Sequence, residues 1–293
     1  MSEAQAAHSV WRDLRRRWAT WAALGAIAAA AVGASAAQER PADAARRGLE
    51  LARRVVQAQD TPGFQIRARM VVGTESDGAP RPTVLQVRLV GRRETGVTRI
   101  LFQVLWPNTL KGHAAVIERR KSPPVTGFLF DLPDRVTPLT PALIVAPFAG
   151  SGLTLEDLAD DFWRWPAQRV AGQRQDGKRA CTILESQPSQ EAASAYTLVR
   201  SCVDARSAAP RWVEKYGADG ALVKRIAFER RGSQGHDESA RLVMVVDSGA
   251  GVPPTRVEFL KGERDVTVSP AEFSVERLGR LGSKTPPDTG PKR

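Results

Sequence analysis

The sequence predicts a mainly β protein built on one large antiparallel sheet that curls, accompanied by helices. Apolar and polar residues alternate in stretches such as residues 64–72 and 100–106, which is typical of strands with one buried face. Turn-forming pairs such as Asp176-Gly177 and Asp219-Gly220 separate these stretches and predict hairpins. Because the strands are numerous, we expect the sheet to curl into a barrel or partial barrel.

The strands that these patterns predict extend over most of the chain. Further turn signals at Asp77-Gly78, Ser248-Gly249 and Lys261-Gly262 divide the later stretches into hairpins, as in an antiparallel meander. We expect strands near residues 64–73, 83–91, 97–106, 113–120, 126–131, 166–172, 179–186, 195–204, 210–216, 222–231, 239–247, 254–260 and 264–269.

Two helices are expected beside the sheet. From Pro41 to Gln59, apolar residues recur at spacings of three and four, which predicts a helix with one buried face. A second helix begins at Thr154, a favourable N-cap, and continues to Phe162. The intervening residues 137–152 are rich in proline and apolar side chains, and long irregular loops of this kind are often lids. We therefore expect residues 143–148 and the second helix to form a lid.

The first residues have the pattern of a targeting segment. Arginines at positions 12 and 15–17 precede an apolar run over residues 18–32, followed by Ala34-Ser35-Ala36. This order is typical of a secretory signal peptide, and we expect cleavage after Ala36. An uncleaved membrane anchor is the alternative interpretation. The expected organisation is a signal peptide over 1–36, one domain over 37–281 and a disordered tail over 282–293.

The chain is strongly basic, with a formal net charge of +11. Export argues against nucleic acid as a partner, so we expect no nucleic acid binding. The basic clusters Arg92-Arg93, Arg119-Arg120-Lys121 and Arg230-Arg231 are short and lie at strand ends. They are interpreted either as solvated strand edges that discourage aggregation or as groups attracted to anionic lipid headgroups.

Two cysteines, Cys181 and Cys202, lie in neighbouring strands of a predicted hairpin. An oxidising compartment makes a disulfide between them the favoured interpretation, with a turn near Glu191-Ala192. Two buried free thiols are the alternative.

Motifs for catalysis or metal binding are not recognisable in the sequence. Past the targeting segment the histidines are His113 and His236, neither of which has metal-ligand spacing. An acidic cluster on the second helix could hold a cation or a shared proton, but acids in the first turn of a helix more often offset its dipole. The cluster comprises Glu156, Asp157, Asp160 and Asp161. We expect no catalytic residues, no metal and no cofactor.

Four tryptophans remain once the targeting segment is set aside: Trp106, Trp163, Trp165 and Trp212. They fit either the packing of a core or the wall of an apolar cavity inside a partial barrel. The sequence does not separate these two interpretations.

Five stretches resemble, in order, landmarks of the outer-membrane lipoprotein-sorting proteins, the LolA/LolB-like family of bacterial envelopes. The stretch over residues 150–158, GSGLTLEDL, is similar to the family's most specific motif, although Leu155 stands where the family has an aromatic residue. The five stretches are residues 105–113 (LWPNTLKGH), 128–136 (FLFDLPDRV), 150–158, 203–220 and 270–274 (PAEFS).

The resemblance implies a curved antiparallel half-barrel closed by an N-terminal helix and a lid helix around an apolar cavity for acyl chains. It implies a periplasmic carrier that moves a lipid or lipoprotein toward the outer membrane, with transient membrane-surface contact and an inner-membrane transporter as a partner. On this hypothesis the residues expected to line the cavity are Phe102, Val104, Trp106, Phe128, Phe130, Phe148, Trp163 and Phe228.

Two other functions stay open. The same fold could serve an envelope sensor or accessory protein that binds a membrane partner. An enzyme using the acidic cluster is the third hypothesis, because the site and not the fold decides the function.

Overall fold

The computed structural model describes residues 40–74, 81–120, 125–159, 162–177, 179–190, 194–231, 241–249 and 251–283. The predicted signal peptide, the turn near Glu191-Ala192 and His236 lie outside the described residues, as does the predicted tail from residue 284 onward. Within the described ranges, no helix is long and apolar enough to cross a membrane.

One antiparallel sheet of thirteen described strands forms the body of the protein, and it does not close into a barrel. Its order is β6-β5-β4-β3-β2-β1-β13-β12-β11-β10-β9-β8-β7, so the first and last strands along the chain meet in the middle of the sheet. The strands are β1 Gly63–Val72, β2 Thr83–Glu94, β3 Val97–Trp106, β4 Ala114–Arg120, β5 Thr126–Asp131, β6 Arg135–Pro138, β7 Ala167–Asp176, β8 Arg179–Gln187, β9 Leu198–Val203, β10 Pro210–Tyr216, β11 Leu222–Arg231, β12 Arg241–Asp247 and β13 Thr255–Arg264.

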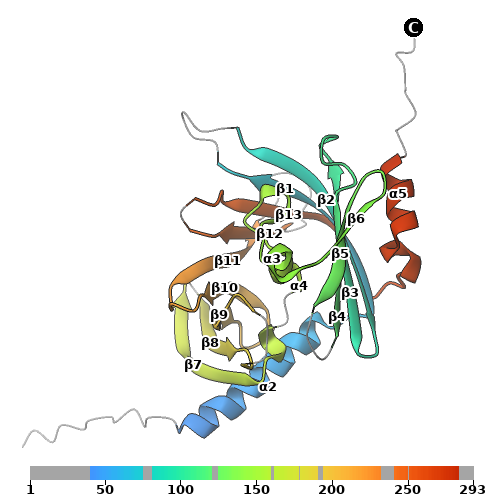
Figure 1. The fold of residues 1–293 in the computed structure, drawn as a ribbon. Helices are drawn as coiled ribbons and strands as arrows, with labels where there is room; N and C mark the ends of the chain where they lie inside the picture. The colour runs from blue at the N-terminus through green and yellow to red at the C-terminus, as the bar shows by residue number, and fades with distance from the viewer. Residues whose placement is uncertain are drawn as a thin grey trace, which may run out of the picture. The chain divides into compact units, whose positions relative to one another are not determined.

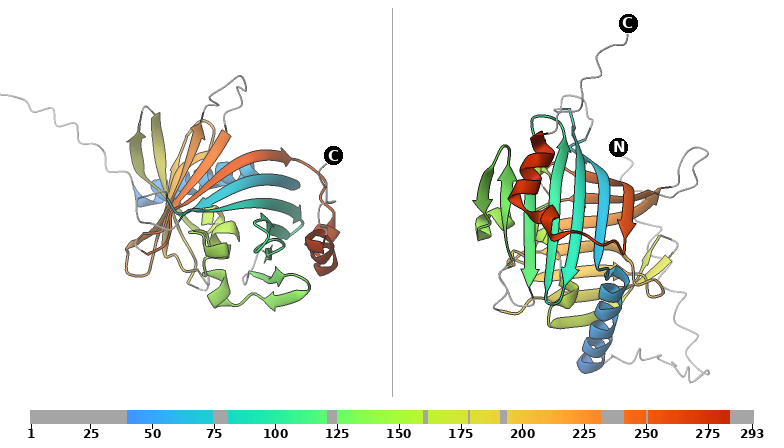
Figure 2. Two further views of the ribbon diagram at one scale, coloured as in Figure 1. Left: turned by 90° about the horizontal axis from the view of Figure 1, so that it is seen from above. Right: turned by 90° about the vertical axis from the view of Figure 1, so that its right-hand side faces the viewer.

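The sheet curves strongly, which confirms the predicted half-barrel (Figures 1 and 2). Successive side chains of a strand point to opposite faces, so a strand with both faces covered can contribute to two hydrophobic clusters. On β3, Phe102 belongs to a large inner cluster on the concave face. Its neighbour Leu101 belongs to a smaller outer cluster on the convex face.

Helix α2, Pro41–Gln59, packs against β7 and β8 at one end of the sheet. Its buried side chains Leu51, Ala52 and Val55 join the inner cluster. The helix approaches β7 closely, because a Cβ on Gly48 would lie 2.4 Å from the Cα of Arg169. The predicted N-terminal helix is confirmed at the predicted residues.

Residues 139–165, between β6 and β7, form a compact segment that we call the insert. It contains α3 Pro141–Ile144, η2 Phe148–Gly150, α4 Leu155–Ala159 and η3 Phe162–Arg164. Figure 1 shows α3 and α4 inside the curve of the sheet. The predicted irregular loop therefore contains short helices, and the helix predicted from Thr154 to Phe162 is shorter than expected.

The C-terminal part of the domain differs from the prediction. Strand β13 continues through Lys261-Gly262, where we expected a turn, to Arg264, and the separate strand expected at residues 264–269 does not form. Gly262 pairs with Ile66 in the ladder, and the strand ends at Arg264, just before Asp265, which has a φ of 59°. The chain then forms η4, Pro270–Phe273, and α5, Val275–Ser283, so α5 includes the first two residues of the predicted tail.

Helix α5 and η4 cover the convex face. Phe273 and Leu278 belong to the outer cluster, and Arg88 on β2 forms an ion pair with Glu272. Figure 2 shows α5 lying on the outside of the sheet. Both faces of this part of the sheet are therefore buried.

The predicted disulfide between Cys181 and Cys202 is confirmed, with a Cα–Cα distance of 5.4 Å. It links β8 to β9, which pair antiparallel as the predicted hairpin requires. With Trp212, the two half-cystines form a third small cluster, and Arg174 and Arg225 lie over the Trp212 ring.

Candidate functional site

The concave face carries apolar side chains that are only partly covered. Several half-buried side chains pack against the inner cluster, and we call five of them, on strands β2, β3, β11, β12 and β13, the apolar row. Their positions in neighbouring strands follow from the ladder: Phe228 lies opposite Met244, and Phe259 lies opposite Ala68. The apolar row consists of Leu89, Ile100, Phe228, Met244 and Phe259.

The same strands are fully buried closer to the insert. On β11, Ile226 is 4% exposed, whereas Phe228 two residues later is half-buried. On β12, Val246 is fully buried and Met244 is half-buried. The concave face thus changes along its strands from a closed core to an apolar surface that is partly open to water. Covering such a surface with hydrocarbon is favourable by about 25 cal/mol per Å².

The insert is anchored in the core by Phe148. Its ring packs edge-on against Phe102 at 4.8 Å between centroids and stacks on His113 at 5.0 Å. His113 Nδ1 lies 2.5 Å from a carboxylate oxygen of Asp131, which orients the imidazole beneath the ring. Ala149, the next residue, adopts a φ of 50°, a left-handed conformation that a non-glycine residue rarely adopts.

Backbone contacts fix the turn that follows Phe148. The hydroxyl of Ser151, which is fully buried, donates to the carbonyl of Phe148 at 2.7 Å. The amide of Gly152 donates to Thr255 Oγ1 of β13 at 2.8 Å, and Ser248 Oγ donates to the Gly152 carbonyl at 3.1 Å. The glycine-rich GSG stretch is therefore a structural joint between the insert and the middle of the sheet.

Thr154 and Asp157 form a reciprocal cap at the start of α4. The Asp157 amide donates to Thr154 Oγ1 at 3.2 Å, and the Thr154 amide donates to Asp157 Oδ2 at 2.8 Å. This is the geometry of a capping box with aspartate in the third position. The predicted N-cap is confirmed.

Asp157 also forms a buried ionic cluster with two lysines from the sheet. Lys215 Nζ donates to Asp157 Oδ1 at 2.9 Å, Lys224 pairs with Oδ2, and the Tyr196 hydroxyl donates to Oδ1 at 3.0 Å. The side chains of Asp157, Lys215 and Lys224 are 0%, 1% and 4% exposed. Lys215 Nζ also lies 4.9 Å from the centre of the Tyr196 ring.

The cluster perturbs the acidity of its members. Burial alone raises the pKa of Asp157, but the charges of Lys215 and Lys224 and hydrogen bonds from Lys224 and Thr154 outweigh it, so the pKa lies well below its ordinary value. Burial, together with the negative charge of Asp157, raises the pKa of Tyr196 far above its ordinary value. Asp157 is therefore ionised at neutral pH and holds α4 against β10 and β11.

The other predicted acidic residues have different roles. Glu156 accepts hydrogen bonds from Ser194 Oγ at 2.6 Å and from the Ala195 amide at 3.2 Å. Asp160 and Asp161 lie outside the described residues. Among the residues that are described, no group of three or more His, Cys, Asp or Glu side chains could hold a metal ion.

The structure brings together five of the eight predicted cavity residues. Phe102, Val104, Phe148 and Trp163 belong to the inner cluster, and Phe228 packs against it. The other three lie elsewhere. Phe128 and Phe130 are on the convex face in the outer cluster, and Trp106 is 47% exposed at the end of β3. On β5 it is Leu129, between the two phenylalanines, that packs against the inner cluster.

The two buried lysines were not predicted. Lys215 and Lys224 are directly opposite one another in the β10–β11 ladder, at positions whose neighbours Val213 and Ile226 point into the inner cluster. The sequence did contain a signal for them. Side chains alternate between the two faces of a strand, and each lysine stands at a position where the alternation places a buried residue.

Solved structures place the described part of the chain in a known fold. A proposed outer membrane lipoprotein-sorting protein domain from Vibrio parahaemolyticus matches with a TM-score of 0.70 at 20% identity, covering 80% of this chain and 100% of that one. A DUF1329 family protein from Desulfovibrio piger matches with a TM-score of 0.70 at 17% identity, covering 80% and 99%. A LolA superfamily protein from Nitrosomonas europaea matches with a TM-score of 0.56 at 14% identity, covering 79% and 97%.

The fold is therefore the open half-barrel of the LolA-like lipoprotein-sorting proteins, as the sequence motifs predicted. A family model described as "uncharacterized protein" matches residues 133–280, just over half of the chain, and the chain belongs to that family. No curated protein matches this chain.

Proposed function

We propose that this protein is a periplasmic carrier that binds the acyl chains of a lipid or lipoprotein on its concave face and moves them toward the outer membrane. The observation that carries the proposal is the apolar row, five half-buried side chains on one continuous face. A hydrocarbon chain laid on this face gains roughly 0.8 kcal/mol for each CH₂ that leaves water. The apolar row gives such a chain a path over strands β3, β2, β13, β12 and β11, with β1 lying between β2 and β13.

The fold comparisons support the proposal at the level of architecture. One matching structure is described as a proposed lipoprotein-sorting domain and another as a member of the LolA superfamily. Because the sequence identity is 20% or lower, the comparisons support the fold alone. The proposed class of ligand rests on the apolar row.

The insert is the candidate lid of the proposed site. Its apolar side chains, Phe148 and Leu155 among them, fill one end of the concave face, and the cluster around Asp157 holds them there. A carrier must release its ligand as well as bind it. This requirement favours a lid, here the insert, that moves as a unit over a sheet that stays fixed. The short helices of the insert fit such a cover, and its contacts with the sheet at Phe148, Gly152 and Asp157 are those that an opening would have to break.

Two measurements test this function. Protein purified from an envelope fraction without detergent is extracted and its lipids are identified by mass spectrometry, and its ability to move an acylated fluorophore between vesicle populations is measured. We expect stoichiometric acyl-containing lipid and accelerated transfer. Capture of one specific membrane protein, with neither lipid nor transfer, would instead identify the sensor or accessory role.

A further inference from the structure

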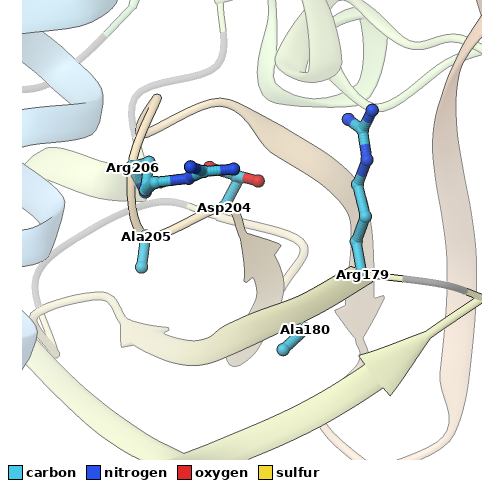
Figure 3. Close-up of a pocket in the computed structure, with 5 residues that line it drawn as sticks. All are labelled: Arg179, Ala180, Asp204, Ala205 and Arg206. Carbon is cyan, nitrogen blue, oxygen red and sulfur yellow. The ribbon is translucent and has the colours of Figure 1, made fainter.

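A polar pocket of about 420 Å³ lies apart from the apolar row. It is formed where strand β8 begins and where the chain turns between β9 and β10 (Figure 3). None of the lining residues belongs to the inner cluster, so the pocket is separate from the proposed acyl-chain site. The lining residues are Arg179, Ala180, Asp204, Ala205 and Arg206.

The turn that forms one wall is internally fixed. The carboxylate of Asp204 accepts hydrogen bonds from the amides of Arg206 and Ser207, each at 3.0 Å, and from Ser207 Oγ at 3.1 Å. These bonds, with that of the Ser207 amide first among them, lower the pKa of Asp204. The amide of Ala208, whose φ is 54°, donates to the Asp204 carbonyl at 2.9 Å. Asp204 is thus committed to shaping the turn.

Neighbouring elements hold both walls in place. The disulfide joins Cys181, next to Ala180, to Cys202, two residues before Asp204. Arg54 of α2 donates to the carbonyl of Ala205 at 2.7 Å, and Arg211 donates to the carbonyl of Arg179 at 3.2 Å. Two wall carbonyls are therefore already satisfied.

The groups that remain for a ligand are mainly cationic donors. Arg179 and Arg206 line the pocket from two different segments, and both are exposed (Figure 3). Arg206 interacts electrostatically with the nearby carboxylate of Asp204. Among the described residues, however, no acidic side chain forms an ion pair within 4.0 Å with Arg179 or Arg206, whereas Arg211 pairs with Asp176. Ala180 and Ala205 add only methyl groups. A guanidinium offers a planar set of donors that matches the oxygens of a phosphate, and it stays charged at any physiological pH.

We propose that this pocket binds a phosphate group through Arg179 and Arg206, with the phosphate of an anionic phospholipid headgroup and free phosphate as the two sources to be distinguished. The proposal does not depend on acyl-chain binding, because it uses other residues on another part of the sheet. The proposed site would give this basic chain a specific place at which to contact an anionic ligand.

The test compares two double variants of the full chain that lose the same charge. R179Q/R206Q removes both pocket guanidiniums. R67Q/R81Q removes two exposed arginines on and before strands β1 and β2, for which no ion pair is found among the described residues. Binding is measured by co-sedimentation with phosphatidylcholine vesicles, with and without phosphatidylglycerol, and by calorimetric titration with inorganic phosphate. Unchanged unfolding midpoints confirm that both variants are folded.

For the probe that wild type binds, phosphatidylglycerol vesicles or inorganic phosphate, we expect R179Q/R206Q to bind about tenfold more weakly, because it loses two charge-assisted contacts. We expect R67Q/R81Q to lose far less affinity. Loss of binding to phosphatidylglycerol vesicles alone identifies the headgroup, and loss of calorimetric phosphate binding identifies the free anion. Equal losses in the two variants would show a general effect of net charge and would overturn the proposal. So would a wild-type protein that binds neither probe.

Discussion

Asp157 of the insert and Lys215 of strand β10 form an ion pair of 2.9 Å in which neither side chain is more than 1% exposed. Lys224 on β11 pairs with the second oxygen of the same carboxylate. An ion buried this deeply that loses its partner keeps an uncompensated charge, which is strongly unfavourable. This cluster is therefore the main polar connection between the insert and the sheet, while Phe148 is the main apolar one.

The substitution Asp157→Asn tests that connection. It keeps the shape of the side chain but leaves two buried lysines without their carboxylate, so we expect a loss of about 3–5 kcal/mol in the free energy of unfolding. Urea denaturation measures the loss. The control Glu263→Gln, which breaks the exposed pair with Lys261, should change the unfolding free energy by no more than about 0.5 kcal/mol. Similar small effects for both variants would contradict the assigned role of Asp157.

The pH dependence of stability follows from the same carboxylate. Its pKa in the folded protein is depressed below the ordinary value of 3.8, so its stabilising contribution is complete above that value and is lost as the pH falls below it. We expect Asp157 to contribute no pH dependence between pH 5 and pH 8. In acid titrations followed by circular dichroism, wild type should lose stability below about pH 4 more steeply than Asp157→Asn, in which this group no longer titrates. Parallel acid limbs for the two proteins would contradict the depressed pKa.

The disulfide should stabilise the domain by restricting the unfolded chain. The two cysteines are 21 residues apart in sequence, and closing a loop of this size contributes about 3 kcal/mol in the chain-entropy account. Thermal and urea unfolding of the double variant C181A/C202A should show that loss. A variant as stable as wild type would mean that the pairing of β8 with β9 and the packing of Trp212 suffice to hold this hairpin.

Phe102 and Phe130 provide a matched pair for assigning the ligand face. Both are buried, at 2% and 0% exposure, but Phe102 is in the inner cluster and Phe130 in the outer cluster. Replacing either with Leu should destabilise the fold by a similar amount, about 1–2 kcal/mol. Only Phe102→Leu should change the affinity for an acylated fluorophore. A change with Phe130→Leu alone would place the ligand on the convex face.

The sequence was informative about strands because their alternation depends on burial of one face. Strands β3 and β10 occur at the predicted residues, and the disulfide and the N-terminal helix are as expected. Strand β6, only four residues long, was missed. The segment after β13 was predicted as a strand, although Asp265, with its positive φ, ends the ladder before it.

The site was harder to predict because α5 covers the convex face, so that the strands beneath it carry apolar residues on both faces. In strand β5, residues 128–130 are all apolar, so alternation cannot tell which of them face the concave side. The two phenylalanines were the natural choice, yet α5 covers them and Leu129 faces inward. The pairing of Lys215 with Asp157 joins residues 58 positions apart, which only the register of the sheet and the position of the insert determine.

Acyl-chain binding by the apolar row is tested most directly by placing a charge on it and a matched charge beside it. Phe259 belongs to the apolar row, and Leu260, the next residue on β13, is 48% exposed. The affinity for a fatty-acid fluorophore is measured for Phe259→Lys, Leu260→Lys and wild type. We predict that Phe259→Lys binds at least about tenfold more weakly, because a buried ammonium opposes hydrocarbon, and that Leu260→Lys binds like wild type. Equal affinities for all three proteins, or no binding by wild type, would contradict the account.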